Sequence, residues 1–355
     1  MSRAKKGLWL AVATMHVAAC AFAQGLDIEK PRNVILIGWD GAQRAHVQEC
    51  LERGELPTLK RLATEGVMVD EEVKGKTDTK AGWTQILTGY DPNVTGVFNN
   101  AKYRDVPKGL SIFERLEEHF GKDNFVTVAV IGKKGHCGEI NPPKKVKFEE
   151  AKEPEPPVKE KGKGKKGKQP GAKKPAQGQI VEEDGVKYRV FGGSPYYTMH
   201  FACDAWEFGL MKDEKVGTRA IELLEKYKDK PFFFFVHFAE VDHSGHKHGE
   251  NSKEYNDALI SNDTWTGKIL DKLKELKLDD KTLVYVTPDH GFNEGAKNHS
   301  NAPHIFLATN DKRLQKSMAP ATRTDIPVTI LARFGLDLAK FQPPLAGRVL
   351  TKAGN

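Results

Sequence analysis

Three short groups of carboxylate and imidazole side chains each follow an apolar run in this sequence. They are Asp40 after 34–39, Asp242 with His246 after 232–238, and Asp289 with His290 after 282–286. Continuous apolar runs of this kind are typical of strands buried on both faces. Because the carboxyl ends of parallel strands meet at one edge of an α/β sheet, we expect the three groups to lie together. Carboxylate and imidazole ligands suit a divalent metal, so the pattern predicts a metal site at that edge.

The spacing within one of these groups favours zinc. Asp242 and His246 are four residues apart, so one helical turn places both side chains on the same face. Taken alone, the pair also fits a helix-capping Asp beside a surface His, and Asp40 alone fits a turn residue. The occurrence of three such groups at three strand ends favours metal binding over these simpler explanations.

A catalytic zinc site takes three or more protein ligands, so a further histidine is expected. His299 is the preferred residue because it lies in the polar loop 297–301. His304 begins an apolar run, and we expect it in the core. Three further histidines are weaker candidates: His237, His243 and His248.

A hydrolase with two metal ions also requires a nucleophile, and the segment that begins at Thr79 contains a candidate. Thr79 lies nine residues before Thr88, which is followed by Gly89, and Asn100 comes about twenty residues after Thr79. This arrangement resembles the nucleophile segment of the alkaline phosphatase/sulfatase superfamily. The resemblance is to the type I phosphodiesterase/nucleotide pyrophosphatase branch and to related bacterial alkaline phosphatases with a Thr nucleophile.

The resemblance extends over about 34–350 and implies two divalent metal ions, most simply zinc. It implies that one ion is bound by Asp40, Thr79, Asp289 and His290, and the other by Asp242, His246 and His299. It also implies that Asn100 hydrogen-bonds a substrate oxygen. Lys133, in the Gly-Lys-Lys-Gly sequence after a predicted strand, is similar to a phosphate-binding Lys of some family monoesterases, with an ordinary surface Lys as the alternative.

The function implied is hydrolysis of a small-molecule phosphoric ester, mono- or diester, through a covalent phospho-threonine. A Thr hydroxyl becomes a competent nucleophile when a metal lowers its pKa. Sulfatases of the superfamily carry Cys or Ser at this position, so Thr79 counts against sulfate esters. Lys80 and Gly82 replace an aromatic residue and an Asn that are common beside the phosphodiesterase nucleophile, so diester preference does not carry over.

Other functions remain open at this stage. A sulfatase-like hydrolase of another ester or of a phosphonate is the main enzymatic alternative, and a phosphomutase is another. From a different class, the chain could be a metal-binding surface protein without turnover. The intact nucleophile and the seven residues expected to bind metal favour an enzyme.

The first 23 residues have the pattern of a secretory signal peptide. Arg3, Lys5 and Lys6 precede the apolar run 8–23, which ends in Ala-Phe-Ala. We therefore expect an exported protein, periplasmic or extracellular. In an alternative interpretation, the segment ending at Cys20 is a lipoprotein box and the protein is lipid-anchored. No other run reaches the ~18 apolar residues that a transmembrane helix requires.

The formal net charge of +7 does not indicate a nucleic-acid partner. The leader contributes three positive charges, and 159–174, with eight lysines and one glutamate, contributes a net +7. The remainder therefore carries −3, which is not typical of nucleic-acid binding. The basic stretch belongs to 141–180, which is rich in Lys, Pro and Gly and is predicted to be a disordered insert.

Alternating strand and helix patterns over 355 residues predict a doubly wound α/β fold with a mostly parallel central sheet flanked by helices and a small cap or insert. The catalytic domain is expected to comprise 24–140 and 181–355. Predicted strands are 34–39, 125–131, 186–191, 232–238, 282–286 and 304–308. Predicted helices are 57–63, 80–87, 111–120, 212–227, 255–276 and 327–334. The sequence does not indicate an oligomeric state.

Overall fold

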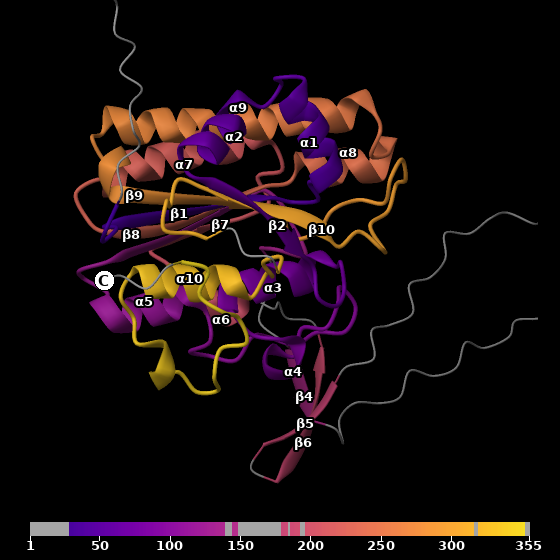
Figure 1. The fold of residues 1–355 in the computed structure, drawn as a ribbon. Coiled ribbons are helices and arrows are strands. Elements are labelled where there is room, and N and C mark those ends of the chain that lie inside the picture. The colour runs from indigo at the N-terminus through magenta and orange to yellow at the C-terminus, as the bar shows by residue number, and fades with distance from the viewer. Residues whose placement is uncertain are drawn as a thin grey trace, which may run out of the picture.

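A seven-stranded sheet runs through the centre of the protein (Figure 1). The computed structural model describes residues 28–138, 144–147, 179–183, 185–191, 196–315 and 319–351. The strand order is β2-β10-β9-β1-β8-β3-β7. In sequence order these strands are β1 (Asn33–Trp39), β2 (Val67–Glu72), β3 (Val126–Ile131), β7 (Ala205–Glu207), β8 (Phe232–Phe238), β9 (Thr282–Thr287) and β10 (His304–Thr309).

The register of the central strands aligns their carboxyl ends. Strand β1 pairs in parallel with β8 and β9, and Gly38 lies opposite both His237 and Thr287. Strand β3 pairs in parallel with β8, with Ile131 opposite the same His237. Because all four strands run in one direction and end at the same level, the residues that follow them emerge at one edge. The mostly parallel sheet is as predicted, with β10 antiparallel to both of its neighbours.

Helices cover both faces of the sheet (Figure 1). On one face lie α1 (Arg44–Glu52), α2 (Pro57–Glu65), α7 (Asp213–Tyr227), α8 (Glu240–His248) and α9 (Lys253–Glu275). On the other face lie α3 (Thr79–Thr88), α5 (Ile112–Phe120) and α10 (Asp325–Arg333), with α4 (Pro92–Thr95) and α6 (Tyr197–His200) below them. Two 3-10 turns, η2 (Asp279–Lys281) and η3 (Leu338–Lys340), complete the described elements. This arrangement is the predicted doubly wound α/β fold.

The two faces of the sheet build two hydrophobic cores. Along β8, Phe233 and Phe235 belong to the core shared with α3, α5 and α10, whereas Phe232 and Phe234 belong to the core under α7 and α9. This division follows from the strand geometry, because successive side chains point to opposite faces. A continuous apolar run was therefore a reliable sign of a strand that is buried on both sides.

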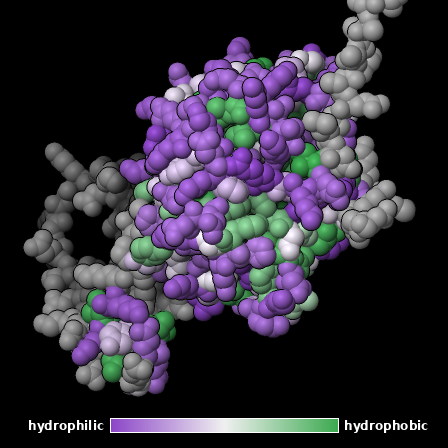
Figure 2. All heavy atoms as spheres, turned by 90° about the vertical axis from the view of Figure 1, so that its left-hand side faces the viewer, coloured by the Kyte–Doolittle hydropathy of each residue, from purple (hydrophilic) through white to green (hydrophobic). Residues whose placement is uncertain are grey.

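A second, three-stranded antiparallel sheet stands apart from the body, with the order β4-β6-β5 (Figures 1 and 2). It consists of β4 (Lys144–Lys147), β5 (Gln179–Glu183) and β6 (Val186–Phe191). It exposes the hydrophobic side chains of Ile180 and Val186 among hydrophilic neighbours. Strand β6 is the predicted cap strand.

The small sheet corrects the expectation of an unstructured insert over 141–180. Both ends of that segment form strands, because β6 supplies a hydrogen-bonding partner to β4 on one side and to β5 on the other. Local composition did not indicate this pairing. Residues 148–178, like the expected leader 1–23 with Cys20, lie outside the described residues. None of the described helices combines the length and apolar character needed to cross a bilayer.

Deleting 159–174 tests whether the basic stretch contributes to folding or chemistry. We expect the melting temperature to stay within a few degrees and the rate on a small phosphate ester to stay within a few-fold, because this composition cannot support a packed core. The deletion retains β4 and β5. Thermal unfolding and initial rates measure the two effects, and a collapse of either one would show that the stretch belongs to the site or the cap.

Candidate functional site

Most of the side chains predicted to do chemistry meet at the carboxyl edge of the sheet. Asp40 follows β1, Lys133 follows β3, and Asp289 and His290 follow β9. Asp242 lies in α8, directly after β8. The convergence therefore results from parallel strands that end in register.

The predicted metal ligands form two overlapping groups. Asp242, His246 and His299 form one group, and Asp40, Asp242 and His290 form the other. Within each group the potential ligand atoms lie within 4.8 Å of one another. Asp242 belongs to both groups, so its carboxylate could serve an ion held by either one.

Two further predicted ligands complete the second group. Asp289 Oδ2 lies 3.4 Å from His290 Nε2, and Asp289 Oδ1 accepts a hydrogen bond of 3.3 Å from the Gly41 backbone N–H. Thr79 Oγ1 lies 3.2 Å from the same His290 Nε2. The structure thus brings together all seven residues that were predicted to bind metal.

The chemistry of these donors fits divalent metal ions. Asp242 Oδ1 and Asp289 Oδ2 are buried oxygens without a hydrogen-bond partner among the described residues. Burial, together with the nearby His299, lowers the pKa of His290 to about 3. Burial likewise lowers the pKa of His299. Both imidazoles are therefore neutral at physiological pH, which is the form that binds a metal.

Asp40 is held as a carboxylate by three neighbours. His237 Nε2 lies 2.9 Å from Asp40 Oδ2, and the Trp83 indole N–H donates to the same oxygen at 3.4 Å. Burial opposes ionisation, but the charge of Lys133 and the hydrogen bond from His237 lower the pKa of Asp40 to about 2. His237 thus contacts a predicted ligand and belongs to neither ligand group.

Lys133 lies at the centre of the cluster, not at the surface. Its Nζ is 2.7 Å from Asp242 Oδ2, 3.3 Å from both Asp40 carboxylate oxygens and 3.1 Å from Thr79 Oγ1. Burial opposes the charge, but the carboxylates of Asp242 and Asp40 raise the pKa of Lys133. The same ammonium holds the pKa of Asp242 well below its usual value despite burial. The alternative of an ordinary surface Lys is therefore wrong.

Thr79 is the first residue of α3, a helix whose ten residues are all buried. A helix N-terminus favours a negatively charged group, because its first N–H groups have no partner within the helix. Two glycines allow α3 to pack this closely. A Cβ at Gly38 would lie 2.3 Å from the Trp83 ring, and a Cβ at Gly82 would lie 2.7 Å from Asp289 Cβ.

Asn100 lies beside the start of α3. Its side-chain Oδ1 accepts a 2.9 Å hydrogen bond from the Lys80 backbone N–H, and its own backbone N–H donates to Asp78 Oδ1 at 3.1 Å. Since Oδ1 is occupied by a donor, the side-chain amide nitrogen is the atom that can donate to a substrate oxygen. The position agrees with the predicted role, which stays a prediction.

Three other candidate histidines, His304, His243 and His248, belong to neither ligand group. His304 is exposed and pairs with Glu72 at 2.8 Å, so the expectation of a core residue is wrong. It is the first residue of β10, opposite Glu72 of β2. His243 is also exposed, and His248 pairs with Glu254 at 3.6 Å. His299 is the histidine that joins the ligand group, with its Nε2 3.2 Å from His246 Nε2.

The sequence did not predict some of the residues that hydrogen-bond to the predicted ligands. Nothing in the sequence pattern shows that the indole of Trp83 bonds Asp40. Arg323 is 1% exposed and donates to the Asp289 carbonyl at 3.0 Å. The residue types next to Arg323 in the sequence do not indicate that its side chain is buried.

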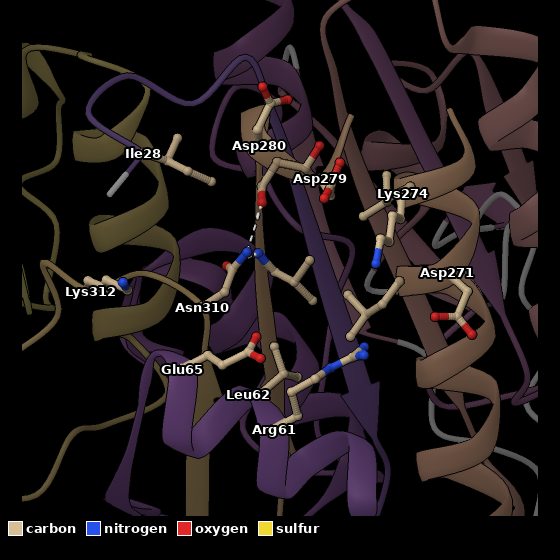
Figure 3. Close-up of a pocket in the computed structure, with 14 residues that line it drawn as sticks. Ile28, Arg61, Leu62, Glu65, Asp271, Lys274, Asp279, Asp280, Asn310 and Lys312 are labelled. Carbon is tan, nitrogen blue, oxygen red and sulfur yellow. Dashed lines mark hydrogen bonds between the residues drawn. The ribbon is translucent and has the colours of Figure 1, made fainter. Parts of the chain in front are cut away.

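A separate cavity of about 300 Å³ lies near the start of β9, at the edge opposite the cluster (Figure 3). Charges of both signs line it, among them Arg61, Lys274 and Asp279. The Asn310 amide there bonds β9 backbone groups, donating to the Thr282 carbonyl at 3.0 Å and accepting from the Val284 N–H at 2.8 Å. The described lining includes no histidine, so this cavity offers no comparable ligand set.

The fold is that of the alkaline phosphatase superfamily. A superfamily member from Vibrio parahaemolyticus aligns with a TM-score of 0.54 and 18% identity over 92% of this chain and 71% of that chain. The lipoteichoic acid synthase LtaP from Listeria monocytogenes aligns with a TM-score of 0.51 and 14% identity, covering 92% and 75%. At these identities the likeness concerns the fold.

The chain belongs to the type I phosphodiesterase/nucleotide pyrophosphatase family, whose sequence model matches residues 34–324. Mouse ectonucleotide pyrophosphatase/phosphodiesterase family member 1 is 32% identical over 107 residues, which is 28% of this chain and 11% of that protein. Human arylsulfatase H is 39% identical over 90 residues, which is 23% of this chain and 16% of that protein. The matched region spans well under two thirds of either relative.

Removing individual ligands tests the two-metal arrangement. With zinc supplied, we expect about two ions per chain, and His246→Ala should lose about one of them. Asp242→Ala should weaken the binding of both zinc ions, because the Asp242 carboxylate belongs to both ligand groups. Elemental analysis after dialysis measures the content. His243→Ala is the matched control on the same helix and should retain both ions; equal content in all four proteins would contradict the assignment.

Proposed function

We propose that this protein is an exported phosphoric ester hydrolase that uses two zinc ions and Thr79 as the nucleophile. The observation that carries the proposal is the environment of Thr79 Oγ1, which lies 3.1 Å from Lys133 Nζ and 3.2 Å from His290 Nε2 at the start of a buried helix. Membership of the phosphodiesterase family supports the same chemistry. The predicted leader supports export, and the mature chain would begin at Gln24.

The residues that would hold the ions are those of the two ligand groups. Asp40, Thr79, Asp289 and His290 would hold one ion, and Asp242, His246 and His299 the other, with Asp242 placed to contact both. When bound, two such ions supply Lewis-acid stabilisation of negative charge on the reacting oxygens and lower the pKa of the nucleophile. The remaining work falls to groups of the chain itself.

The chemical step is an in-line substitution at phosphorus. Thr79 Oγ, having lost its proton to water, donates an electron pair to phosphorus, and the bond from phosphorus to the leaving oxygen breaks. The leaving oxygen takes that electron pair and then a proton from water. The amide nitrogen of Asn100 and the ammonium of Lys133 are placed to stabilise charge on the phosphoryl oxygens. The oxygen of a water molecule then attacks the phosphorus and loses a proton to solvent, the bond from phosphorus to Thr79 Oγ breaks, Thr79 Oγ regains a proton, and phosphate is released.

The position of Lys133 supports monoesters as the preferred class. A phosphate monoester carries one more negative charge than a diester, and an ammonium beside the nucleophile favours the more highly charged substrate. Sulfate esters are the second candidate substrate class, because one of the similar proteins is human arylsulfatase H. Thr79 counts against sulfate esters, because sulfatases of the superfamily carry Cys or Ser at the nucleophile position. A metal-binding protein without turnover would retain zinc and show no rate on any ester.

Substituting Thr79 tests the covalent mechanism. We expect Thr79→Ala to lower kcat by ~10³-fold or more, because the attacking oxygen is lost. Thr79→Ser should retain part of the activity, since the hydroxyl remains. Rapid acid quenching followed by peptide mass analysis should locate a phosphate on the peptide that contains Thr79.

A matched control lies in the same helix. Thr84 is also buried, and its hydroxyl donates to the Lys80 carbonyl at 2.6 Å, away from the ligand groups. Thr84→Ala should keep kcat within a few-fold. If Thr79→Ala hydrolyses phosphate esters at the parental rate, Thr79 is not the nucleophile.

Comparing three aryl esters tests the substrate class. We expect the zinc-loaded protein to hydrolyse an aryl phosphate faster than an aryl phosphodiester, and an aryl sulfate least. Lys133→Met should reduce kcat/KM for the monoester by ~10²-fold and for the diester by clearly less, because it removes a charge-assisted contact. Lys134→Met alters an exposed neighbour and serves as control. Equal losses on both esters would argue against monoester selection by Lys133.

A further inference from the structure

The segment that leads into Thr79 is tied to three separate parts of the candidate site. We call residues 74–78 the nucleophile loop. The Thr77 hydroxyl donates to the His299 carbonyl, and Asp78 Oδ1 accepts from the Asn100 backbone N–H at 3.1 Å. The third tie is made by Arg323, from the far end of the domain.

Arg323 bridges the nucleophile loop and a predicted ligand segment. Its Nη1 donates to the Asp289 carbonyl at 3.0 Å. Its Nη2 donates to the Lys76 carbonyl at 3.0 Å and approaches the Lys74 carbonyl at 3.4 Å. A guanidinium is planar and presents its N–H groups in a fixed fork, so these contacts set the distance between the two segments.

Burying this charge is costly, which argues against a chance arrangement. The Arg323 side chain is 1% exposed, and transfer of an ionised group out of water is unfavourable unless it is paired. Burial lowers the pKa of Arg323 to about 10, while the charges of Asp289, Glu71 and Asp78 oppose that change. The group therefore stays protonated at neutral pH and acts as a fixed cation behind the site.

Gly82 makes room for this contact. A Cβ at Gly82 would lie 3.0 Å from Arg323 Nη1 and 3.1 Å from the Asp289 carbonyl oxygen. A side chain at position 82 would therefore crowd both the guanidinium and Asp289, so the glycine permits their close approach to α3.

We infer that Arg323 is a positioning residue that holds the nucleophile loop against the Asp289-His290 segment, so that Thr79 Oγ faces the phosphorus in line with the leaving oxygen. The inference rests on the proposed function. Arg323 does not touch the reacting atoms in this arrangement; it acts through the backbone of the loop and of Asp289. A substitution of Arg323 should therefore change the rate of phosphoryl transfer rather than the affinity for the substrate.

The experiment compares Arg323→Lys and Arg323→Met with Arg333→Met in the full-length protein. Arg333 is a matched control, because it is also buried, pairs with Asp311 at 2.8 Å and donates to the Glu29 carbonyl at 3.0 Å, remote from the site. The measurements are zinc content, thermal unfolding, and the single-turnover rate of phosphate transfer from an aryl phosphate to Thr79.

We expect Arg323→Met to slow transfer by ~10²-fold per folded molecule, the size of loss that a displacement of about 1 Å causes. Zinc content and KM should change little, and Arg323→Lys should recover part of the rate. Arg333→Met should lower the melting temperature while its transfer rate stays within threefold of the parent. If Arg323→Met does not fold, Arg323→Lys provides the comparison, and its transfer rate should still fall below that of the parent protein.

Two outcomes would overturn the inference separately from the proposed function. If the parent protein forms phospho-Thr79 and both Arg323 variants form it at the parental rate, Arg323 has no positioning role although the function stands. If the losses in Arg323→Met and Arg333→Met both follow the fraction of folded protein alone, the role of Arg323 is general stability. A parent protein that never phosphorylates Thr79 overturns the proposed function, and this inference with it.

Discussion

Three carboxylates buried within one small volume are the constraint on which the rest of this structure depends. Asp40, Asp242 and Asp289 are at most 4% exposed, and like charges out of water repel strongly unless cations compensate them. Lys133 contacts the first two. For Asp289, burial and the charge of Asp40 raise the pKa well above its usual value. The imidazole of His290, whose pKa is lowered by burial, lies beside Asp289 with its Nε2 3.4 Å from Asp289 Oδ2.

The fold meets this requirement through parallel strands that end in register. Four strand ends at one level bring together residues that are far apart in the sequence, and the ladder between β1 and its neighbours fixes their spacing. The helix that carries Thr79 packs on this edge without a gap, because Gly38 leaves room for Trp83. A nucleophile placed on a buried helix is held more rigidly than one on a loop, which suits a reaction that depends on alignment.

The chain combines family features with differences of its own beside the nucleophile. It shares the superfamily fold and the family sequence pattern, yet it covers only a small part of the length of the curated relatives. Lys80 and Gly82 stand where the nucleophile segment that this chain resembles commonly has an aromatic residue and an Asn. In the structure, the Lys80 backbone N–H binds Asn100, and a Cβ at Gly82 would crowd Arg323 and Asp289. The missing side chain at Gly82 thus permits a close contact beside the proposed nucleophile Thr79.

The sequence by itself determined strands β1, β3, β8, β9 and β10 and most of the long flanking helices, because apolar runs and helical periodicity are local signals, and it placed Asp40 and Asp289 directly after their strands. Strands β2 and β7 and helices α1 and α8 were not predicted. The tertiary structure decided which side chains and strands pair with one another. That Trp83 and His237 bond Asp40, that Lys133 lies inward, that His304 is exposed and that Lys144–Lys147 forms a strand all depend on the register of distant segments. The burial of Arg323 is of the same kind. Such contacts are fixed only when strands and helices pack, because their energy comes from groups that are remote in the chain.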